Sequence, residues 1–214
     1  MKDKQSVKPQ LQFYIEKEII PQYAFFDKGH NINHVQKVIE DSIEISQQYD
    51  TDINMVYAIA AYHDIGMPQG RENHHITSGK ILKNDKRLLS WFDENQLAIM
   101  QEAIEDHRAS NTHEPRSIYG KIVAEADRDI SPETIIYRSI AFSISNYACN
   151  SYEDHLKRVY SHIENKYGEN GYLKLWLETP KNTKGLQKVR KLLQNKQKFE
   201  QYFEKIWKTY SHNF

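Results

Sequence analysis

The stretch INMVYAIAAYHDIG, residues 53–66, decides how this sequence folds. Apolar side chains recur in it at spacings of three and four residues, which is the period of one face of an α-helix. Asp52 is an N-cap type of residue immediately before the stretch, while Gly66 and the nearby Pro68 are typical of a helix end. The pattern therefore predicts a largely buried helix that ends just past its His-Asp pair.

The same helical spacing extends along the chain, which has only 8 Gly and 6 Pro among 214 residues, and no alternating strand pattern accompanies it. Ser131 and Pro132 mark one further helix start. Helices are predicted over residues 11–20, 35–45, 53–65, 75–83, 94–107, 118–127, 134–148, 152–167, 171–178 and 185–210. We expect an all-α protein, a single-domain helical bundle over residues 1–214. Its motif-bearing core lies at about 20–130, and the helices of 131–214 pack on that core.

Composition disfavours several classes of partner. Lys plus Arg and Asp plus Glu number 29 each, so the overall charge does not favour nucleic acid or an anionic membrane. No segment approaches the roughly 20 apolar residues that span a bilayer, and no apolar segment follows the N-terminus. The single cysteine, Cys149, is predicted to be a buried small hydrophobe. We expect a cytoplasmic protein with no membrane partner, and we leave a homodimer formed through aromatic helices open.

A metal site is the main chemical prediction. His63 and Asp64 fall near the end of the buried helix, where the helix dipole favours a positive charge. A carboxylate buried beside an imidazole is costly unless a cation or hydrogen bonds compensate it. His34, near a helix start, and Asp127, at a helix end, are predicted to complete the ligand set. This mixed nitrogen and oxygen set suits Mn, Mg, Co, Fe, Ni or Zn with positions left for water.

These residues and their flanks resemble the HD-domain phosphohydrolases, and in particular the small stand-alone bacterial branch of that superfamily. HNINHV at residues 30–35 is similar to the family's opening motif, AYHDIG at residues 61–66 is similar to its His-Asp motif, and Asp127 corresponds to its distant Asp. One departure is Asn31, where related proteins commonly have Asp. We expect this departure to weaken a supporting contact and to leave the metal ligands unchanged.

The resemblance implies hydrolysis of phosphoester or phosphoanhydride bonds by metal-activated water, with one or two divalent ions per chain. Asp64 would both bind metal and orient the water. His75 and His107 are similar to two further family histidines, so they are expected to contact phosphate, hold a second metal or protonate the leaving oxygen. Arg71 is our expected phosphate clamp because its guanidinium offers a fork of donors. The predicted substrate is a phosphorylated small molecule, with a nucleotide favoured.

Three alternatives stay open at this point. The first is a non-catalytic metal- and ligand-binding regulatory module of the same fold. The second is an oxygenase with two irons, since the family resembled includes such members. The third is a nucleic-acid binder using the basic stretch of residues 181–191, but apolar positions at helical spacing in that stretch favour a packed helix with a solvated basic face.

Overall fold

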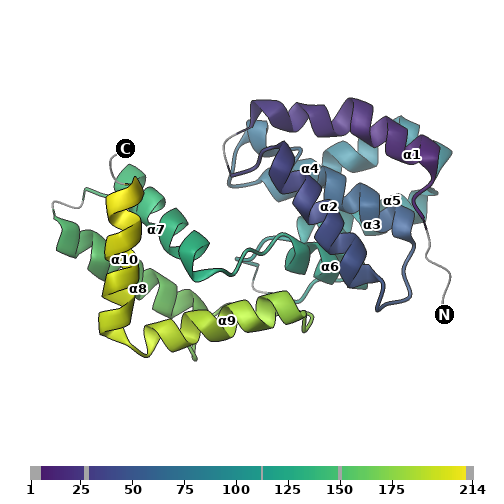
Figure 1. The fold of residues 1–214 in the computed structure, drawn as a ribbon. Helices are drawn as coiled ribbons and strands as arrows, with labels where there is room; N and C mark the ends of the chain where they lie inside the picture. The colour runs from purple at the N-terminus through teal and green to yellow at the C-terminus, as the bar shows by residue number, and fades with distance from the viewer. Residues whose placement is uncertain (1–5, 27–28, 112, 149–150, 211–214) are drawn as a thin grey trace. The chain divides into compact units, whose positions relative to one another are not determined.

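The computed structural model describes residues 6–26, 29–111, 113–148 and 151–210, and it is all-α as predicted, with ten α-helices and no strand among these residues. Cys149 lies outside them. The chain divides into two compact units, residues 1–128 and 129–214 (Figure 1). Whether the two behave as the one domain expected over 1–214 stays a prediction. None of the described helices combines the length and apolar character needed to cross a bilayer.

The first unit carries the predicted site. Its α-helices are α1 (Pro9–Tyr14), α2 (Ile32–Ser46), α3 (Ile53–Tyr62), α4 (His74–Asn84), α5 (Glu94–Glu105) and α6 (Ile118–Ala126). After α1 the chain continues through a π-helical turn, Ile15–Ile19, and a 3-10 helix, Ile20–Phe25, so Pro21 lies inside helical structure and does not end it. Two shorter 3-10 helices, Met67–Gln69 and Lys86–Ser90, flank α4.

Helix α3 is the centre of this unit, and each of its ten residues is buried. It packs against α2, α5 and α6, which surround it together with α4. The Asp52 side chain accepts a hydrogen bond from the Asn54 N–H at 2.8 Å, which confirms the predicted N-cap. A helix buried on all sides has to be apolar all round, and this explains why residues 53–62 hold no charged side chain.

The second unit is built from α7 (Pro132–Asn146), α8 (Tyr152–Tyr167), α9 (Pro180–Leu193) and α10 (Lys196–Tyr210). Ser131 caps α7 and Pro132 occupies its first turn, as predicted. Phe199 and Phe203 are fully buried, and Phe203 stacks on Trp207 with ring centroids 5.6 Å apart. His155 is buried in this aromatic core, where its Nδ1 lies 2.9 Å from Ser143 Oγ.

Two helix predictions in this unit were wrong. Residues 171–178 are not helical, because the N–H groups of Tyr172 and Leu173 turn back to the carbonyls of Asn165 and Lys166 at the end of α8. The predicted helix of 185–210 begins earlier, at Pro180, and is broken into α9 and α10. Asn195 lies at the break, where its side chain accepts a hydrogen bond from the Lys198 N–H at 2.9 Å and caps α10.

Asn31 is the N-cap of α2, and its side chain accepts a hydrogen bond from the His34 N–H at 3.1 Å. Asp and Asn are about equally good N-caps, so the departure noted in the sequence keeps this local contact. The cap fixes the first turn of α2, which carries His34. With Asn31 in place of Asp, the side chain at this position therefore still accepts the hydrogen bond that holds the first turn of α2 and with it His34.

We expect Asn31→Ala to destabilise the metal-free protein by about 1 kcal/mol, since it leaves the first turn of α2 uncapped. Asn31→Asp should match or slightly exceed the wild type, because a carboxylate at a helix N-terminus is favourable. Urea denaturation followed by circular dichroism measures both differences. Equal stability of Asn31→Ala and the wild type would contradict a stabilising cap.

Candidate metal centre

Five helix ends in the first unit meet at one buried site. His34 lies in the first turn of α2, His63 directly follows α3, and Asp127 directly follows α6. His74 is the first residue of α4, and His107 lies two residues after α5. The C-terminal ends of α3, α5 and α6 carry partial negative charge and outnumber the N-terminal ends of α2 and α4, which carry partial positive charge.

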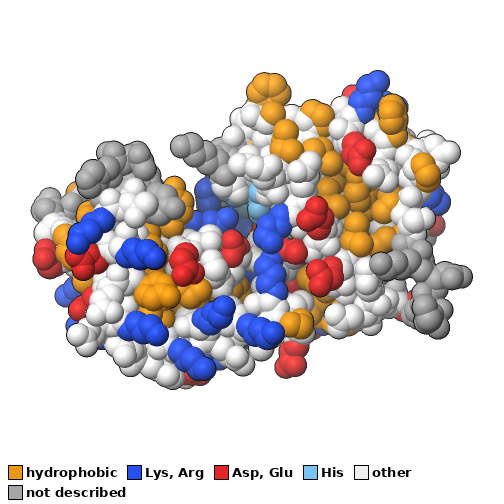
Figure 2. Space-filling view, viewed as in Figure 1, with side chains coloured by type: hydrophobic (Ala, Val, Ile, Leu, Met, Phe, Trp, Pro, Cys, Tyr) orange, Lys and Arg blue, Asp and Glu red, His pale blue; other side chains and the backbone are white. Residues whose placement is uncertain are grey.

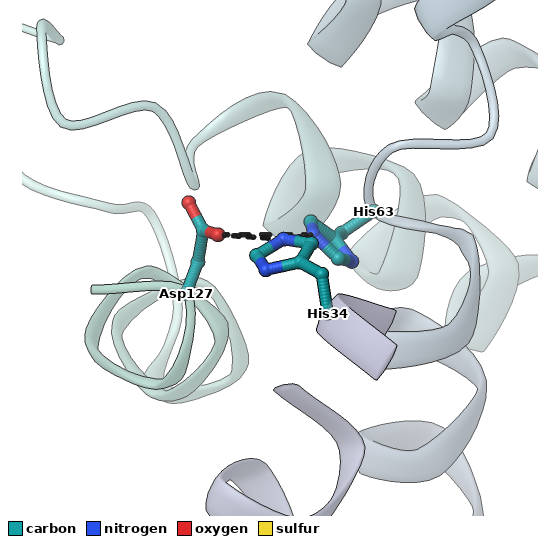
Figure 3. A group of neighbouring side chains, drawn as sticks. All are labelled: His34, His63 and Asp127. Carbon is teal, nitrogen blue, oxygen red and sulfur yellow. Dashed lines mark hydrogen bonds and ion pairs between the residues drawn. The ribbon is translucent and has the colours of Figure 1, made fainter. Parts of the chain in front are cut away.

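His34, His63 and Asp127 form the first group of potential metal ligands, with one ligand atom from each within 4.8 Å of the others. Figure 3 shows the two imidazoles side by side and facing the carboxylate of Asp127. His34 Nε2 lies 3.2 Å from Asp127 Oδ1 and 3.3 Å from His63 Nε2. Three of the four ligands predicted from the sequence are thus brought together in this group.

Asp64 connects this group to a second one. Its Oδ2 lies 3.1 Å from His63 Nε2 and 3.6 Å from His34 Nε2. Its Oδ1 lies 3.2 Å from His74 Nε2 and 3.5 Å from His107 Nε2 on the other side. Asp64, His74 and His107 also have ligand atoms within 4.8 Å of one another. One buried carboxylate is therefore shared by four imidazoles.

The second group contains a histidine that the sequence did not single out. His74 Nε2 lies 3.3 Å from His107 Nε2, so the partner of the predicted His107 is His74. The neighbouring His75 has its ring centroid 5.6 Å from that of His74 and belongs to neither group of potential ligands. The sequence placed the start of α4 at residue 75, whereas α4 begins at His74. Because consecutive helical residues point about 100° apart, His74 and His75 face different directions, and His74 is the one that faces Asp64.

Three of the imidazoles are held in the same way. His63 Nδ1 lies 2.7 Å from the Ala60 carbonyl, His74 Nδ1 lies 2.7 Å from the Arg71 carbonyl, and His107 Nδ1 lies 2.6 Å from the Ile104 carbonyl. A carbonyl can only accept, so each Nδ1 donates its proton and each Nε2 keeps its lone pair when the ring is neutral. Metal-binding histidines are typically oriented by such a contact.

The electrostatics of the site favour positive charge. Burial lowers the pKa of His34, but the nearby carboxylates of Asp127 and Asp64 outweigh it and raise that pKa to about 9. Burial also acts to lower the pKa of His63, but the carboxylates of Asp64 and Asp127 outweigh this effect and raise that pKa. Burial raises the pKa of Asp64 and of Asp127, but the surrounding histidines lower both below the ordinary value of an aspartate. Divalent ions can replace the protons held by these imidazoles.

The donor set fits a divalent cation. Asp64 is 2% exposed, and its Oδ1 accepts no hydrogen bond in the described structure. Two pairs of imidazole Nε2 atoms approach within 3.3 Å, an arrangement in which neutral lone pairs repel unless a proton or an ion lies between them. Nitrogen and carboxylate donors in groups of three leave coordination positions for water or substrate.

Gly66 allows the second group to form. A Cβ at this position would lie 2.7 Å from both the His74 carbonyl oxygen and the Ser78 backbone nitrogen. The Gly66 N–H also donates a hydrogen bond to Ser78 Oγ at 2.9 Å. The first turn of α4 therefore packs directly on the loop after Asp64, and this brings His74 to the carboxylate.

Two arginine side chains make hydrogen bonds that hold the chain segments around His107 in place. Arg116 holds the buried carboxylate of Asp106 through its Nε and one terminal nitrogen, at 3.0 and 2.9 Å. Arg108 donates a hydrogen bond to the Glu72 carbonyl at 2.6 Å and so ties the end of α5 to the turn before α4. The sequence gave no signal for either contact, because both join residues ten or more positions apart.

The remaining predicted residues lie at the edge of the site. Arg71 contributes its backbone carbonyl to His74, while the residue as a whole is exposed in the turn before α4. Burial, together with the positive charge of Arg108 and the histidines beside it, lowers the pKa of His75 to about 4. His75 is therefore neutral at pH 7. The catalytic and phosphate-binding roles of Arg71, His75 and His107 stay predictions.

Comparison with known proteins places these residues in a family. The HD domain model matches residues 31–130, a range that includes all six residues of the two groups. A tRNA (cytidine(56)-2'-O)-methyltransferase of Thermoplasma volcanium is 29% identical over 143 residues, which cover 64% of this chain and 42% of that protein. The chain thus spans less than half of this relative. No solved structure matches the chain.

The two adjacent histidines of α4 provide a matched pair of variants. We expect His74→Ala to weaken binding of a second divalent ion by more than about tenfold, since even supporting partners of a metal ligand contribute roughly 10- to 100-fold. His75→Ala should bind metal as the wild type does. Calorimetric titration with Mn²⁺ measures both. Loss of an ion in His75→Ala, with retention in His74→Ala, would contradict the assignment of His74.

We also expect the metal-free protein to lose stability as pH rises from about 6.5 to about 9. A histidine with a raised folded-state pKa stabilises the fold fully below its unfolded pKa, and this contribution disappears as pH passes the folded pKa. For His34 it is on the order of 1 to 3 kcal/mol. Asp64 and Asp127 stay ionised across this window because their pKa values are lowered.

Thermal unfolding in chelator at several pH values measures this loss. His34→Gln should show a flatter pH dependence, and saturating Mn²⁺ should reduce the fall in the wild type because the ion replaces the protons. A Tm of the metal-free wild type that rises over this pH range would contradict the prediction.

Proposed function

Residues 31–130 of this chain belong to the HD-domain superfamily, and from this premise we propose that the protein is a metal-dependent phosphohydrolase. The proposed substrate is a phosphorylated small molecule, with a nucleotide favoured. The observation that supports this proposal best is the position of Asp64, which faces His34 and His63 on one side and His74 and His107 on the other.

The two groups of residues would each hold one divalent ion. His34, His63, Asp64 and Asp127 would hold one divalent ion, and Asp64, His74 and His107 would hold a second one. Such ions lower the pKa of bound water and neutralise charge on a phosphoryl group. In the hydrolysis, the oxygen of water forms a bond to phosphorus, the bond from phosphorus to the leaving oxygen breaks, and the leaving oxygen takes up a proton.

The chain's own groups support the remaining steps. Asp64 directs one oxygen to each group, so it can bind a cation on each side, and the remaining lone pairs of its carboxylate can orient a water. Asp64 and His63 are almost fully buried, which strengthens their electrostatic effect on a phosphate that enters the site. Arg71, in the exposed turn before α4, is proposed to clamp a phosphate with its fork of donors.

His75 has a distinct proposed role. Its pKa of about 4 makes it neutral at pH 7, so it could contact a phosphate as a hydrogen-bond donor without adding a charge. Protonation of the leaving oxygen falls more naturally to a water, because His107 would hold an ion through Nε2 while its Nδ1 donates to the Ile104 carbonyl. The name of the Thermoplasma relative describes methyl transfer to tRNA. Because the present chain spans less than half of that protein, hydrolysis is proposed from the HD-domain match and the metal centre, and not from this relative.

The test is phosphate or pyrophosphate release from a panel of nucleotides and sugar phosphates. Metal-stripped protein is resupplied with Mn, Mg, Co, Ni, Fe or Zn. We expect metal-dependent release, and a loss of more than about a hundredfold in Asp64→Ala, because a direct ligand should contribute more than the roughly 10- to 100-fold of its supporting partners. Asp50→Ala removes an exposed carboxylate outside the two groups and should keep the wild-type rate.

Release that survives in Asp64→Ala, or that needs no metal, would contradict the proposal. If protein that binds two metal ions releases no phosphate or pyrophosphate from any compound in the panel, the result would favour one of two alternatives with the same fold, an oxygenase with two irons or a non-catalytic regulatory module. Oxygen consumption by the iron-loaded protein would then identify an oxygenase, and ligand binding without turnover would identify a regulatory module.

A further inference from the structure

The second unit has a row of lysines along one face of α9. Lys181, Lys184, Lys188 and Lys191 follow one another at spacings of three, four and three residues, which places them on the same side of a helix. All four are exposed, while Leu186, Val189, Leu192 and Leu193 form the buried face. Figure 2 shows Lys and Arg side chains gathered over this helix.

This row lines a cavity of about 630 Å³. Lys198 and Tyr202 of α10 form another part of its wall, and the start of α7 with the residues before it, 129–133, forms the rest. All of these residues belong to the second unit, and none belongs to the metal centre. The volume falls in the range of roughly 300–1,000 Å³ that is typical of small-molecule sites.

The cavity carries an excess of positive charge. Five lysines line it against two carboxylates, Asp129 and Glu133. Asp129 is engaged locally, because its side chain accepts hydrogen bonds from the Ser131 N–H and the Thr134 hydroxyl. Lys184, Lys188, Lys191 and Lys198 form no ion pair within the described part of the chain. The cavity therefore favours an anion.

The chain as a whole is neutral, but its positive and negative charges are distributed unevenly between the two units. Residues 129–214 contain 14 Lys and Arg against 9 Asp and Glu, a net charge of +5, and residues 1–128 contain 15 against 20, a net charge of −5. Helix α9 contains no acidic residue. Like charges three and four residues apart destabilise a helix. The dipole at the C-terminal turn of α9 favours Arg190 and Lys191 there and offsets part of this cost, and a bound anion would offset it along the whole row.

The basic residues of α9 differ in their contacts, and Arg190 is an example that does not belong to the lysine row. This side chain donates to the Tyr167 carbonyl at 3.3 Å and lies 3.6 Å from Glu169, which ties α9 to the end of α8. It does not line the cavity. The arginine therefore has a structural contact, whereas Lys184, Lys188 and Lys191 form no ion pair within the described residues and line the cavity.

A glycine inside α9 sets the shape of this cavity. Gly185 lies between Lys184 and Lys188, although glycine disfavours a helix interior by roughly 1 kcal/mol relative to alanine. A Cβ at Gly185 would lie 2.3 Å from the Ile130 carbonyl oxygen. The absence of a side chain lets α9 pack closely on the segment before α7, so the lysine row and the residues before α7 form opposite walls.

We propose that this cavity binds a chain of consecutive phosphate groups carried by a small molecule, either a nucleoside polyphosphate or an inorganic polyphosphate. Ammonium groups in a row match successive phosphates, and Tyr202 offers a ring on which a base can stack. A nucleic-acid strand fits less well, because single-strand sites usually present several aromatic side chains, and Tyr202 is the only aromatic side chain among the described residues that line this cavity. The proposal does not depend on the hydrolase activity proposed for the first unit.

The test uses the full chain with Asp64→Ala in chelator, so that the metal centre neither hydrolyses nor holds the probe. Calorimetry measures binding of tripolyphosphate, ATP and a single-stranded RNA octamer. Substituting Lys184, Lys188 and Lys191 together by Gln should lower the affinity for tripolyphosphate and ATP by about tenfold or more, since each exposed ion pair contributes modestly. Lys196→Gln removes an exposed lysine outside the cavity and should bind as the parent does.

Tighter binding of ATP than of tripolyphosphate would assign a nucleoside polyphosphate, and equal binding would assign the phosphate chain alone. The proposal is overturned if neither probe binds, if the triple variant binds as tightly as Lys196→Gln, or if only the RNA binds. Far-ultraviolet circular dichroism of the triple variant serves as the folding control, since its three substitutions are on exposed positions.

Discussion

The buried carboxylate of Asp64 is the interaction on which the first unit depends. An aspartate that is 2% exposed would be strongly destabilising if it faced apolar side chains alone. Here it faces four imidazoles that come from separate parts of the chain. The unit therefore tolerates this charge only while all of those parts are in position, which links the fold directly to the chemistry.

That requirement explains why so many helices end at the same place. Two of the imidazoles follow the C-terminal ends of α3 and α5, and their Nδ1 atoms donate to carbonyls of the last turns of those helices. Each such contact uses a carbonyl of the last helical turn and orients the ring, and the Ile104 carbonyl also accepts the His107 backbone N–H at 3.3 Å. The same atoms that end the helices thereby prepare the Nε2 positions for a cation.

The sequence was informative where a local pattern carried the signal. It predicted the all-α fold, the caps at Asp52 and Ser131, and the convergence of His34, His63 and Asp127, because each depends on helical spacing or on a nearby cap. It did not identify His74, since choosing between two adjacent histidines requires knowing which side of α4 is turned toward Asp64, and this depends on tertiary packing. It also missed the break at Asn195 and the non-helical residues 171–178, where backbone contacts to α8 replace a weak apolar pattern.

Two glycines connect the architecture of both units to their candidate sites. This helical chain contains only 8 glycines, and helix interiors disfavour them. Gly66 and Gly185 each lie where a Cβ would come within 3 Å of backbone atoms of another segment. In the first unit the close approach brings His74 to Asp64, and in the second it brings the lysines of α9 opposite the residues before α7. In both units, therefore, close packing of backbone on backbone at one glycine helps to position the charged side chains of the site.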